Sequence, residues 1–262
     1  MDILPVDILR AVLHRLASEN DVESVLRFAS TDKAAHALVR SMFYSRTDEP
    51  ELFFVRVRPG EDVQAAVDRC PSGGAVLLEE GTHVSPAGIV LRTDARLFGR
   101  GLATLRTEIL VADTVGNASI DGLTVTSDGE NTITSRAQNR LTVRDCTIRA
   151  RGCGIRVVQG HSTLACNRIE AGNAGVIVLS ESTSSITHNR ITHAGATRHS
   201  CIRMGIVINS YRRHVHHIRE NEIRRFPTGI WLNGRWFTSY AADLATHAHC
   251  NTFVRVGRAV KR

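Results

Sequence analysis

The segment Leu164-Ala-Cys-Asn167-Arg-Ile169 carries a pattern that recurs along the chain: an apolar residue, two further residues, an asparagine, one more residue and a second apolar residue. Clear copies read Ile186-Thr-His-Asn189-Arg-Ile191, Ile218-Arg-Glu-Asn221-Glu-Ile223 and Ala248-His-Cys-Asn251-Thr-Phe253, and weaker copies occupy 143–148 and 120–125. The first positions of successive copies lie 23, 21, 22, 32 and 30 residues apart. Short strands at this spacing cannot bury their apolar faces alone, so the pattern predicts the stacked coils of a solenoid.

A second repeat alternates with the first and consists of a glycine followed by a short apolar strand. We expect these glycines to occupy positions that need a positive φ or a close approach of two backbones. We expect the asparagines of the first repeat to tolerate the left-handed turn conformation and to stack their amides from coil to coil. The copies of the second repeat begin at Gly88, Gly154, Gly175, Gly205, Gly229 and Gly257.

The two repeats predict a right-handed, single-stranded parallel β-helix of roughly seven coils over 55–262. The helical spacing of apolar residues before it predicts a small three-helix domain over 1–48, so we expect a mostly β chain. Aromatic residues make up 5% of the chain, which fits a core of narrow aliphatic rows. The two long offsets predict insertions at 192–204 and within 233–247. Insertions in a solenoid often lie on its binding face, and the second one could equally cap the open end of the core.

The beginning of the predicted solenoid resembles the pectate-lyase-like β-helix superfamily. The resemblance is carried by Val57-Arg-Pro-Gly60-Glu-Asp-Val-Gln64-Ala-Ala-Val67, by Cys70-Pro-Ser-Gly73-Gly74 with the apolar run after it, and by Leu97-Phe-Gly99-Arg-Gly101. It implies a capping helix followed by the first coil. It is specific for the fold and uninformative about activity, because this fold serves lyases, hydrolases, tailspikes and non-enzymatic recognition domains.

The first fifty residues have helical rather than strand periodicity, with apolar residues on one face of each predicted helix. The order of residues resembles that of an F-box, the adaptor-docking motif of SCF-type ubiquitin ligases. The resemblance is carried by Leu4-Pro5, by the acidic-Ile-Leu stretch at 7–9 and by the Asp21-Val22 pair. The usual tryptophan of that motif is missing, and Ala35 and His36 stand there. The resemblance implies that a Skp-type adaptor contacts Leu4, Pro5, Ile8, Leu9, Leu13, Leu16, Val22 and Leu26.

An F-box joined to a β-helix resembles F-box proteins with carbohydrate-binding-and-sugar-hydrolase-type repeats, found in eukaryotes and in large DNA viruses of amoebae. The resemblance implies a substrate-recognition subunit that acts in the cytoplasm or nucleus, with the subunit's own cell and an infected host cell as the two alternatives. An intracellular location also fits six cysteines without a CxxC pair and an N-terminus unlike a secretory signal. No apolar run is long enough for a membrane span, so we expect no membrane association.

Positive charge is concentrated in 111–262, which hold 20 basic and 10 acidic residues. A basic flank suits acidic protein segments, anionic glycans or nucleic acid, although arginine-favouring codon usage explains the same excess. Nucleic acid is the weaker candidate because aromatic residues do not interleave with the basic ones. The candidate contacts to a protein target are Arg190, Arg198, Arg203, Arg212, Arg213, Trp236 and Tyr240.

Catalysis is not the favoured prediction for the solenoid, and we predict neither catalytic residues nor a cofactor. Lyases and hydrolases of this fold need clustered carboxylates. Asp121 and Asp145 fall on neighbouring coils but one position out of alignment, and Asp128 and Glu130 lie in a predicted turn. His214 and His216 would make a weak zinc site, so we predict no metal either.

Three functions remain open from the sequence. The favoured one is a non-catalytic adaptor whose F-box docks the Skp-type protein and whose β-helix holds a protein target. The second is a β-helix that binds or processes carbohydrate, which predicts a groove lined by carboxylates or by Trp236 and Tyr240. The third is a structural protein, such as a virion component, which predicts a stable homo-oligomer.

Overall fold

The computed structural model describes residues 54–99, 102–138, 140–195, 203–209, 216–233 and 250–261. The chain divides into the units Met1–Phe53 and Phe54–Arg262, and every described residue belongs to the second. The predicted helical domain at 1–48 and its eight adaptor-binding candidates therefore lie outside the described residues.

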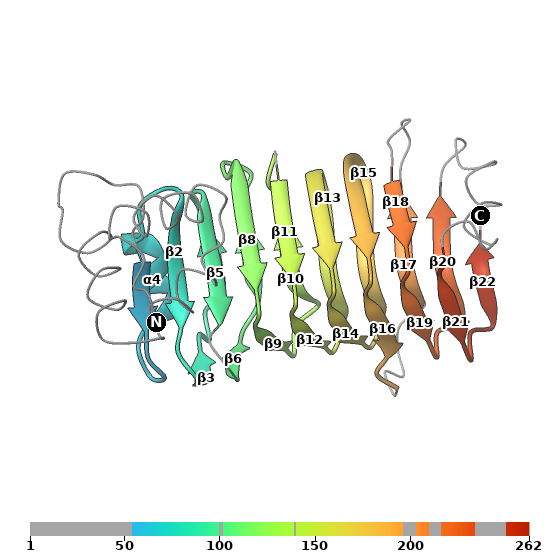
Figure 1. Cartoon of the computed structure of the whole chain (residues 1–262), viewed down its shortest axis with the longest axis horizontal. Helices are drawn as coiled ribbons and strands as arrows, with labels where there is room; N and C mark the ends of the chain where they lie inside the picture. The colour runs from blue at the N-terminus through green and yellow to red at the C-terminus, as the bar shows by residue number, and fades with distance from the viewer. Residues whose placement is uncertain are drawn as a thin grey trace, which may run out of the picture. The chain divides into compact units, whose positions relative to one another are not determined.

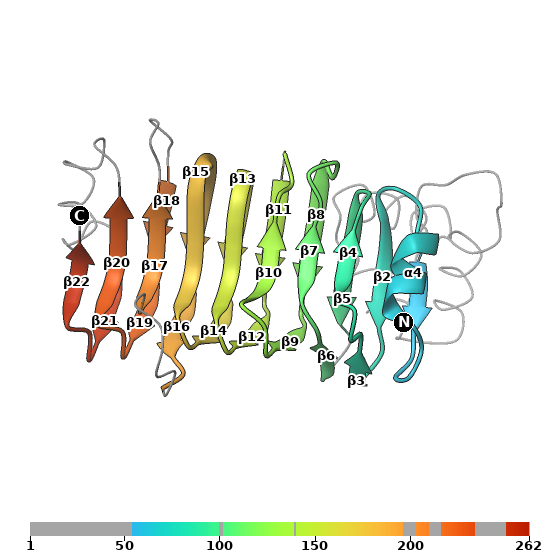
Figure 2. The ribbon, with the colours of Figure 1, turned by 180° about the vertical axis from the view of Figure 1, so that it is seen from behind.

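The second unit is a right-handed parallel β-helix whose strands form three rows, named A1, B and A2 in the order in which each coil visits them (Figures 1 and 2). Rows A1 and A2 belong to one 14-stranded sheet, and row B is a separate 8-stranded sheet, so the chain makes about seven turns. The long strands β13 (Cys153–Ala165) and β15 (Ala174–Thr187) each supply a first half to row A2 and a second half to row A1.

The remaining strands each belong to one row. Row A1 contains β1 (Phe54–Val57), β2 (Gly74–Leu78), β5 (Ala95–Gly99), β8 (Asn117–Asp121), β11 (Arg140–Arg144) and β18 (His216–Arg219). Row B contains β3 (Gly81–Val84), β6 (Ala103–Arg106), β9 (Thr124–Ser127), β12 (Thr147–Ala150), β14 (Arg168–Ala171), β16 (Arg190–His193), β19 (Glu222–Arg224) and β21 (Thr252–Val254). Row A2 contains β4 (Ile89–Leu91), β7 (Ile109–Val111), β10 (Asn131–Ser135), β17 (Met204–Asn209), β20 (Thr228–Asn233) and β22 (Arg258–Lys261).

The core is a set of aliphatic stacks in which equivalent residues of successive coils lie directly above one another. In row B, Ile148 pairs with Ile169, which pairs with Ile191, and all three are fully buried. Residues on either side of these positions point outward, because successive side chains of a strand alternate between its faces. The apolar ends of the repeated hexapeptide therefore build the interior, as the repeat predicts.

A short helix, α4 (Val63–Arg69), lies at the start of the solenoid, where the resemblance implies a capping helix. The Asp62 carboxylate accepts a hydrogen bond from the Ala65 backbone N–H and caps its first turn. Val63 and Val67 are buried in the same core cluster as the strands, so the helix covers the apolar interior at this end.

The asparagines of the hexapeptide form a buried amide ladder at the corner between rows A1 and B. Asn167, Asn189 and Asn221 each donate Nδ2 to the Oδ1 of the next asparagine, at 2.9, 3.0 and 3.1 Å, ending on Asn251. Each Nδ2 also donates to a backbone carbonyl of the preceding coil. The predicted amide ladder is present in the described residues.

The conformational part of that prediction is wrong. The left-handed residue is not the asparagine but the residue before it in each coil, with φ between 50° and 63°. In these coils the first residue of the two-residue turn takes this conformation, and the asparagine after it points its side chain inward and forms hydrogen bonds. The left-handed residues are Gly122, Asp145, Cys166, His188, Glu220 and Cys250.

The glycine repeat is explained by close packing inside the coil. A Cβ on Gly175 would lie 2.2 Å from Ile191 Cγ2 and 2.7 Å from the Gly205 carbonyl oxygen. Gly154, Gly205 and Gly229 are crowded in the same way, and none of the four has a positive φ. For these four glycines the close backbone approach is the correct reason, whereas Gly88, the first glycine of the repeat, has the positive φ of the other predicted reason, at 85°.

The extra residues of the first long offset lie in two places, between β16 and β17 and between β17 and β18. Residues 194–203 separate β16 from β17, whereas two residues separate β14 from β15 in the preceding coil. The second long offset falls after β20, which ends at Asn233. Most of both insertions, including Trp236 and Tyr240, lies outside the described residues.

Candidate functional site: a polar groove beside row B

A groove of about 870 Å³ runs along the corner between rows B and A2. It crosses six successive coils, from the turn after β3 to Ala194, the residue that follows β16. Among the described residues, three arginines, three carboxylates and several hydroxyl groups line it, and none of these lining residues is aromatic. The groove therefore offers charge and hydrogen-bonding groups rather than an apolar surface.

One rim of the groove is built by the last outward-facing position of the row B strands. The pairing of β6, β9, β12 and β14 aligns Arg106, Thr126, Arg149 and Glu170 on successive coils. Arg149 Nε lies 4.0 Å from Glu170 Oε2, an exposed ion pair that contributes little to stability. No partner for the exposed Arg106 is found among the described residues, which leaves its guanidinium available to a ligand.

The floor of the groove consists of the residues that follow this rim, one per coil. Ser85 and Thr107 are buried there, and the Thr107 hydroxyl donates to the Ser85 carbonyl at 2.6 Å. The Ser85 hydroxyl donates to the Gly88 carbonyl at 2.9 Å. The first bond joins neighbouring coils and the second closes the turn between β3 and β4, so together they hold the floor in place.

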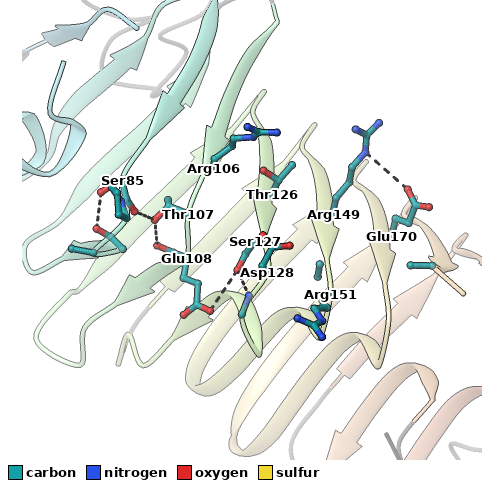
Figure 3. Close-up of a pocket in the computed structure, with 16 residues that line it drawn as sticks. Ser85, Arg106, Thr107, Glu108, Thr126, Ser127, Asp128, Arg149, Arg151 and Glu170 are labelled. Atoms are coloured by element: carbon teal, nitrogen blue, oxygen red, sulfur yellow. Dashed lines mark hydrogen bonds and ion pairs between the residues drawn. The ribbon is translucent and has the colours of Figure 1, made fainter. Parts of the chain in front are cut away.

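The opposite rim comes from the turns that lead into row A2. Figure 3 shows Glu108 and Arg151 directed toward this side, while Arg106 and Arg149 extend toward the other. The Glu108 carboxylate accepts a hydrogen bond of 3.5 Å from Ser127 and occupies the space that a side chain on Gly129 would need. Asp128 is exposed beside it. This rim therefore presents carboxylates of neighbouring coils followed by an arginine.

Of the seven predicted target contacts, Arg190 and Arg203 belong to the described residues, and neither is part of the groove lining. Arg190 lies on the outer face of row B and pairs with Glu222 at 3.2 Å, and Glu222 also binds Arg224. Arg203 precedes β17 beside His193, where burial first and the guanidinium second lower the pKa of that imidazole. The other five candidates lie outside the described residues, and target binding by all seven stays a prediction.

The predicted misalignment of Asp121 and Asp145 is confirmed. Asp121 pairs in the sheet with Arg144, so Asp145 falls one residue further along its coil. Arg144 Nε bridges the two carboxylates at 3.5 and 3.4 Å. Burial raises the pKa of Asp121, and the Ser119 hydroxyl and nearby arginines oppose that rise. This cluster lies on row A1, away from the groove residues.

Sequence reasoning missed the groove because its members are scattered over six repeats and follow no motif. Glu108, Asp128 and Arg151 occupy turns of differing length, which the period of 22 residues does not align. The turn prediction for Asp128 was correct, yet its neighbour across the coils, Glu108, was not singled out. The described residues contain no group of three or more histidines, cysteines or acidic residues placed to hold a metal ion.

Comparison with known proteins agrees with the architecture. The model of the family described as "Right handed beta helix region" matches residues 108–235. Searches of curated proteins and of solved structures returned no match. Within the described part of the chain, no helix is long and apolar enough to cross a membrane. The β-helix fold is compatible with binding either protein or carbohydrate.

Proposed function

We propose that this protein is a recognition subunit that holds an extended segment of a target protein in the groove beside row B. The observation that carries the proposal is the set of charged residues placed at coil spacing along two rims, three arginines and three carboxylates. Six coils are separated by five spacings of roughly 4.8 Å, which gives a path of roughly 24 Å, the length of about seven extended residues. Such a path suits a peptide with both acidic and basic side chains.

The proposal includes the F-box-like segment at 1–48 as the part that docks a Skp-type adaptor inside the cell. Its support is the order of Leu4-Pro5, Ile8-Leu9 and Asp21-Val22 in the sequence. The target would then be presented to the ubiquitin ligase by the β-helix. Adaptor docking and target binding are separable, because they use different units of the chain.

The groove is tested with an array of mixed-charge peptides of about eight residues. The full chain is compared with the double variant Arg106→Gln/Arg151→Gln and with Arg168→Gln, a matched change of an exposed arginine on row B outside the groove lining. We expect sequence-selective binding that the double variant weakens at least about tenfold, a loss of roughly 1.4 kcal/mol, while Arg168→Gln binds like the parent. Equal binding by all three proteins would remove the groove from the proposal.

Docking is tested with a purified eukaryotic Skp-type adaptor in a pull-down. The full chain is compared with Leu4→Ala/Pro5→Ala, and the groove double variant serves as the control that should retain docking. We expect binding that the Leu4/Pro5 change abolishes. Absence of binding to the parent chain would end the ubiquitin-ligase part of the proposal and leave the groove part standing.

Carbohydrate binding is the second candidate, and one observation favours it. Glu108, Asp128 and Glu170 line the groove, which is the carboxylate lining that this hypothesis predicts. Carboxylates on the rims and hydroxyl groups on the floor suit the hydroxyl groups of a glycan as well as peptide side chains. A glycan array probed with the parent and with Glu108→Gln/Asp128→Asn separates the two candidates: selective glycan binding lost in the variant, with a blank peptide array, would replace the protein target by a sugar.

A further inference from the structure

The groove rim that is built by the turns carries one charged residue on each of three successive coils. The sheet register continues past the row B strands and aligns these positions. The Thr107 N–H donates to the Thr126 carbonyl at 2.9 Å, and in the next coil the Arg151 N–H donates to the Ser127 carbonyl at 3.2 Å. Two acidic residues and then a basic one therefore follow the solenoid axis at a coil spacing of roughly 4.8 Å. These residues are Glu108, Asp128 and Arg151.

Glu108 and Asp128 form the acidic centre of this rim. Both side chains are exposed, and within the described part of the chain neither carboxylate has an ion-pair partner. The Glu108 carboxylate reaches into the coil of Asp128, where it accepts the hydrogen bond from Ser127 and fills the space beside Gly129. Two carboxylates are thus brought together, and they suit the ammonium or guanidinium group of a ligand.

Arg151 is the basic centre of the same rim. Its side chain is exposed and, among the described residues, makes no ion pair. Arg149, from the same coil, extends toward the other rim, where Glu170 already pairs with it at 4.0 Å (Figure 3). A carboxylate that enters the groove at this coil therefore finds Arg151 as its available partner, with a second positive charge on the opposite rim.

The separation of the two centres fits one charge spacing in an extended chain. Asp128 lies one coil from Arg151, and Glu108 leans toward that coil, so the acidic and basic centres are about 5 to 7 Å apart along the groove. In an extended chain, side chains two residues apart share a face and are separated by roughly 6.7 Å. Adjacent side chains point to opposite faces, and side chains four residues apart are separated by roughly 13 Å. A pair of charges two residues apart therefore reaches both centres from one face.

We propose that the groove selects an extended target segment with a basic and an acidic side chain two residues apart. The basic side chain lies over Glu108 and Asp128, and the acidic one lies over Arg151. This inference rests on the proposed function, because it specifies the segment that the groove holds. The charges fix no chain direction, since Lys-x-Glu and a reversed Glu-x-Lys present the same two groups to the same two centres.

The spacing is tested with peptides of about eight residues that contain one lysine and one glutamate among serines and threonines. The two charges are adjacent, two residues apart or four residues apart, so composition and net charge stay the same. Each labelled peptide is titrated with the full chain, and binding is followed by fluorescence anisotropy. We expect the peptide with charges two residues apart to bind about fivefold more tightly than the others, the upper end for an exposed ion pair.

Variants at the basic centre test which residue reads the acidic side chain. Arg151→Glu should prefer a Lys-x-Lys peptide to Lys-x-Glu, and the milder Arg151→Gln should lose the preference for the two-residue spacing. Arg168→Glu makes the same charge change on row B outside the groove and should bind like the parent.

The outcomes separate this inference from the proposed function. Equal affinities for the three spacings, or a parent-like preference in both Arg151 variants, would overturn the inference and leave the groove as a peptide site. Absence of binding by every mixed-charge peptide to the parent chain would overturn the inference and the proposed peptide groove together.

Discussion

The two corners that flank row B are built in opposite ways. From β8 onward, the corner between rows A1 and B uses the same two-residue turn with a left-handed first residue, and buried amides lock four of these turns together. The corner between rows B and A2 varies from two residues after β14 to ten after β16, and charged side chains line it as a groove. Uniform spacing produces a continuous hydrogen-bonded ladder, whereas variable turns create recesses in which a ligand can lie.

The largest effect is expected from breaking the uniform corner at Asn189. Its amide makes five hydrogen bonds, to two carbonyls and to the asparagines of both neighbouring coils. Asn189→Ala leaves several buried backbone groups without partners, and we expect a loss of about 3–4 kcal/mol in the free energy of unfolding in urea. Arg190→Ala, which removes only an exposed ion pair, should cost less than about 1 kcal/mol. Equal losses would show that the ladder is not a main source of stability.

The next effect comes from the glycines that let neighbouring coils approach. Gly175→Ala places a Cβ against Ile191 and the Gly205 carbonyl, and overpacking of this kind costs about 1–3 kcal/mol. Gly195→Ala, at the variable corner, has open space around the new Cβ, so its loss of stability comes mainly from the φ of 88°. We expect the urea midpoint to fall further for Gly175→Ala. The reverse order would mean that conformational strain outweighs packing in this solenoid.

A smaller effect, of opposite sign, tests whether the ladder can be extended. Cys146 occupies, in the preceding coil, the position equivalent to Asn167. Its thiol donates to the same kind of backbone carbonyls as an asparagine amide, those of Ile120 at 3.4 Å and Arg144 at 3.2 Å. Cys146→Asn replaces these weak sulfur bonds by amide bonds, so we expect a gain of about 1 kcal/mol in unfolding free energy. Cys146→Ala lacks the donor and serves as the control. A loss of stability in Cys146→Asn would show that this coil is too tight for the amide.

The smallest effect concerns pH at the variable corner. Burial and then Arg203 lower the pKa of His193, so the folded protein favours the neutral imidazole. The stability gained from this preference is present above the unfolded pKa of about 6.5 and is lost as the pH falls through the folded value. We expect acidification from about pH 8 to about pH 5 to lower the thermal midpoint more in the parent than in His193→Gln. Parallel curves would assign the acid sensitivity to other groups.

Much of the β-helix could be predicted from the sequence, because residues of one kind recur at the spacing of one coil. The coil number, the strands around Ile169 and Ile191, the amide ladder and the glycine row all follow from identical residues at fixed spacing. The left-handed position was assigned one residue too late, since Asn167 is typical of that conformation and Cys166 is not. When the side chain of a turn residue forms hydrogen bonds inside the turn, as that of Asn167 does, the residue before it takes the left-handed conformation.

The sequence by itself therefore determined the solenoid, its core rows and the interruptions of its period. The tertiary structure alone decided which surface residues meet: Glu108 with the turn of Asp128 on one rim of the groove, and His188 with Glu220 at the corner between rows A1 and B. The physical reason is that stacking brings residues 20 to 32 positions apart to within one coil spacing. Core positions signal this contact through repeated apolar residues, whereas surface positions vary freely and carry no such signal.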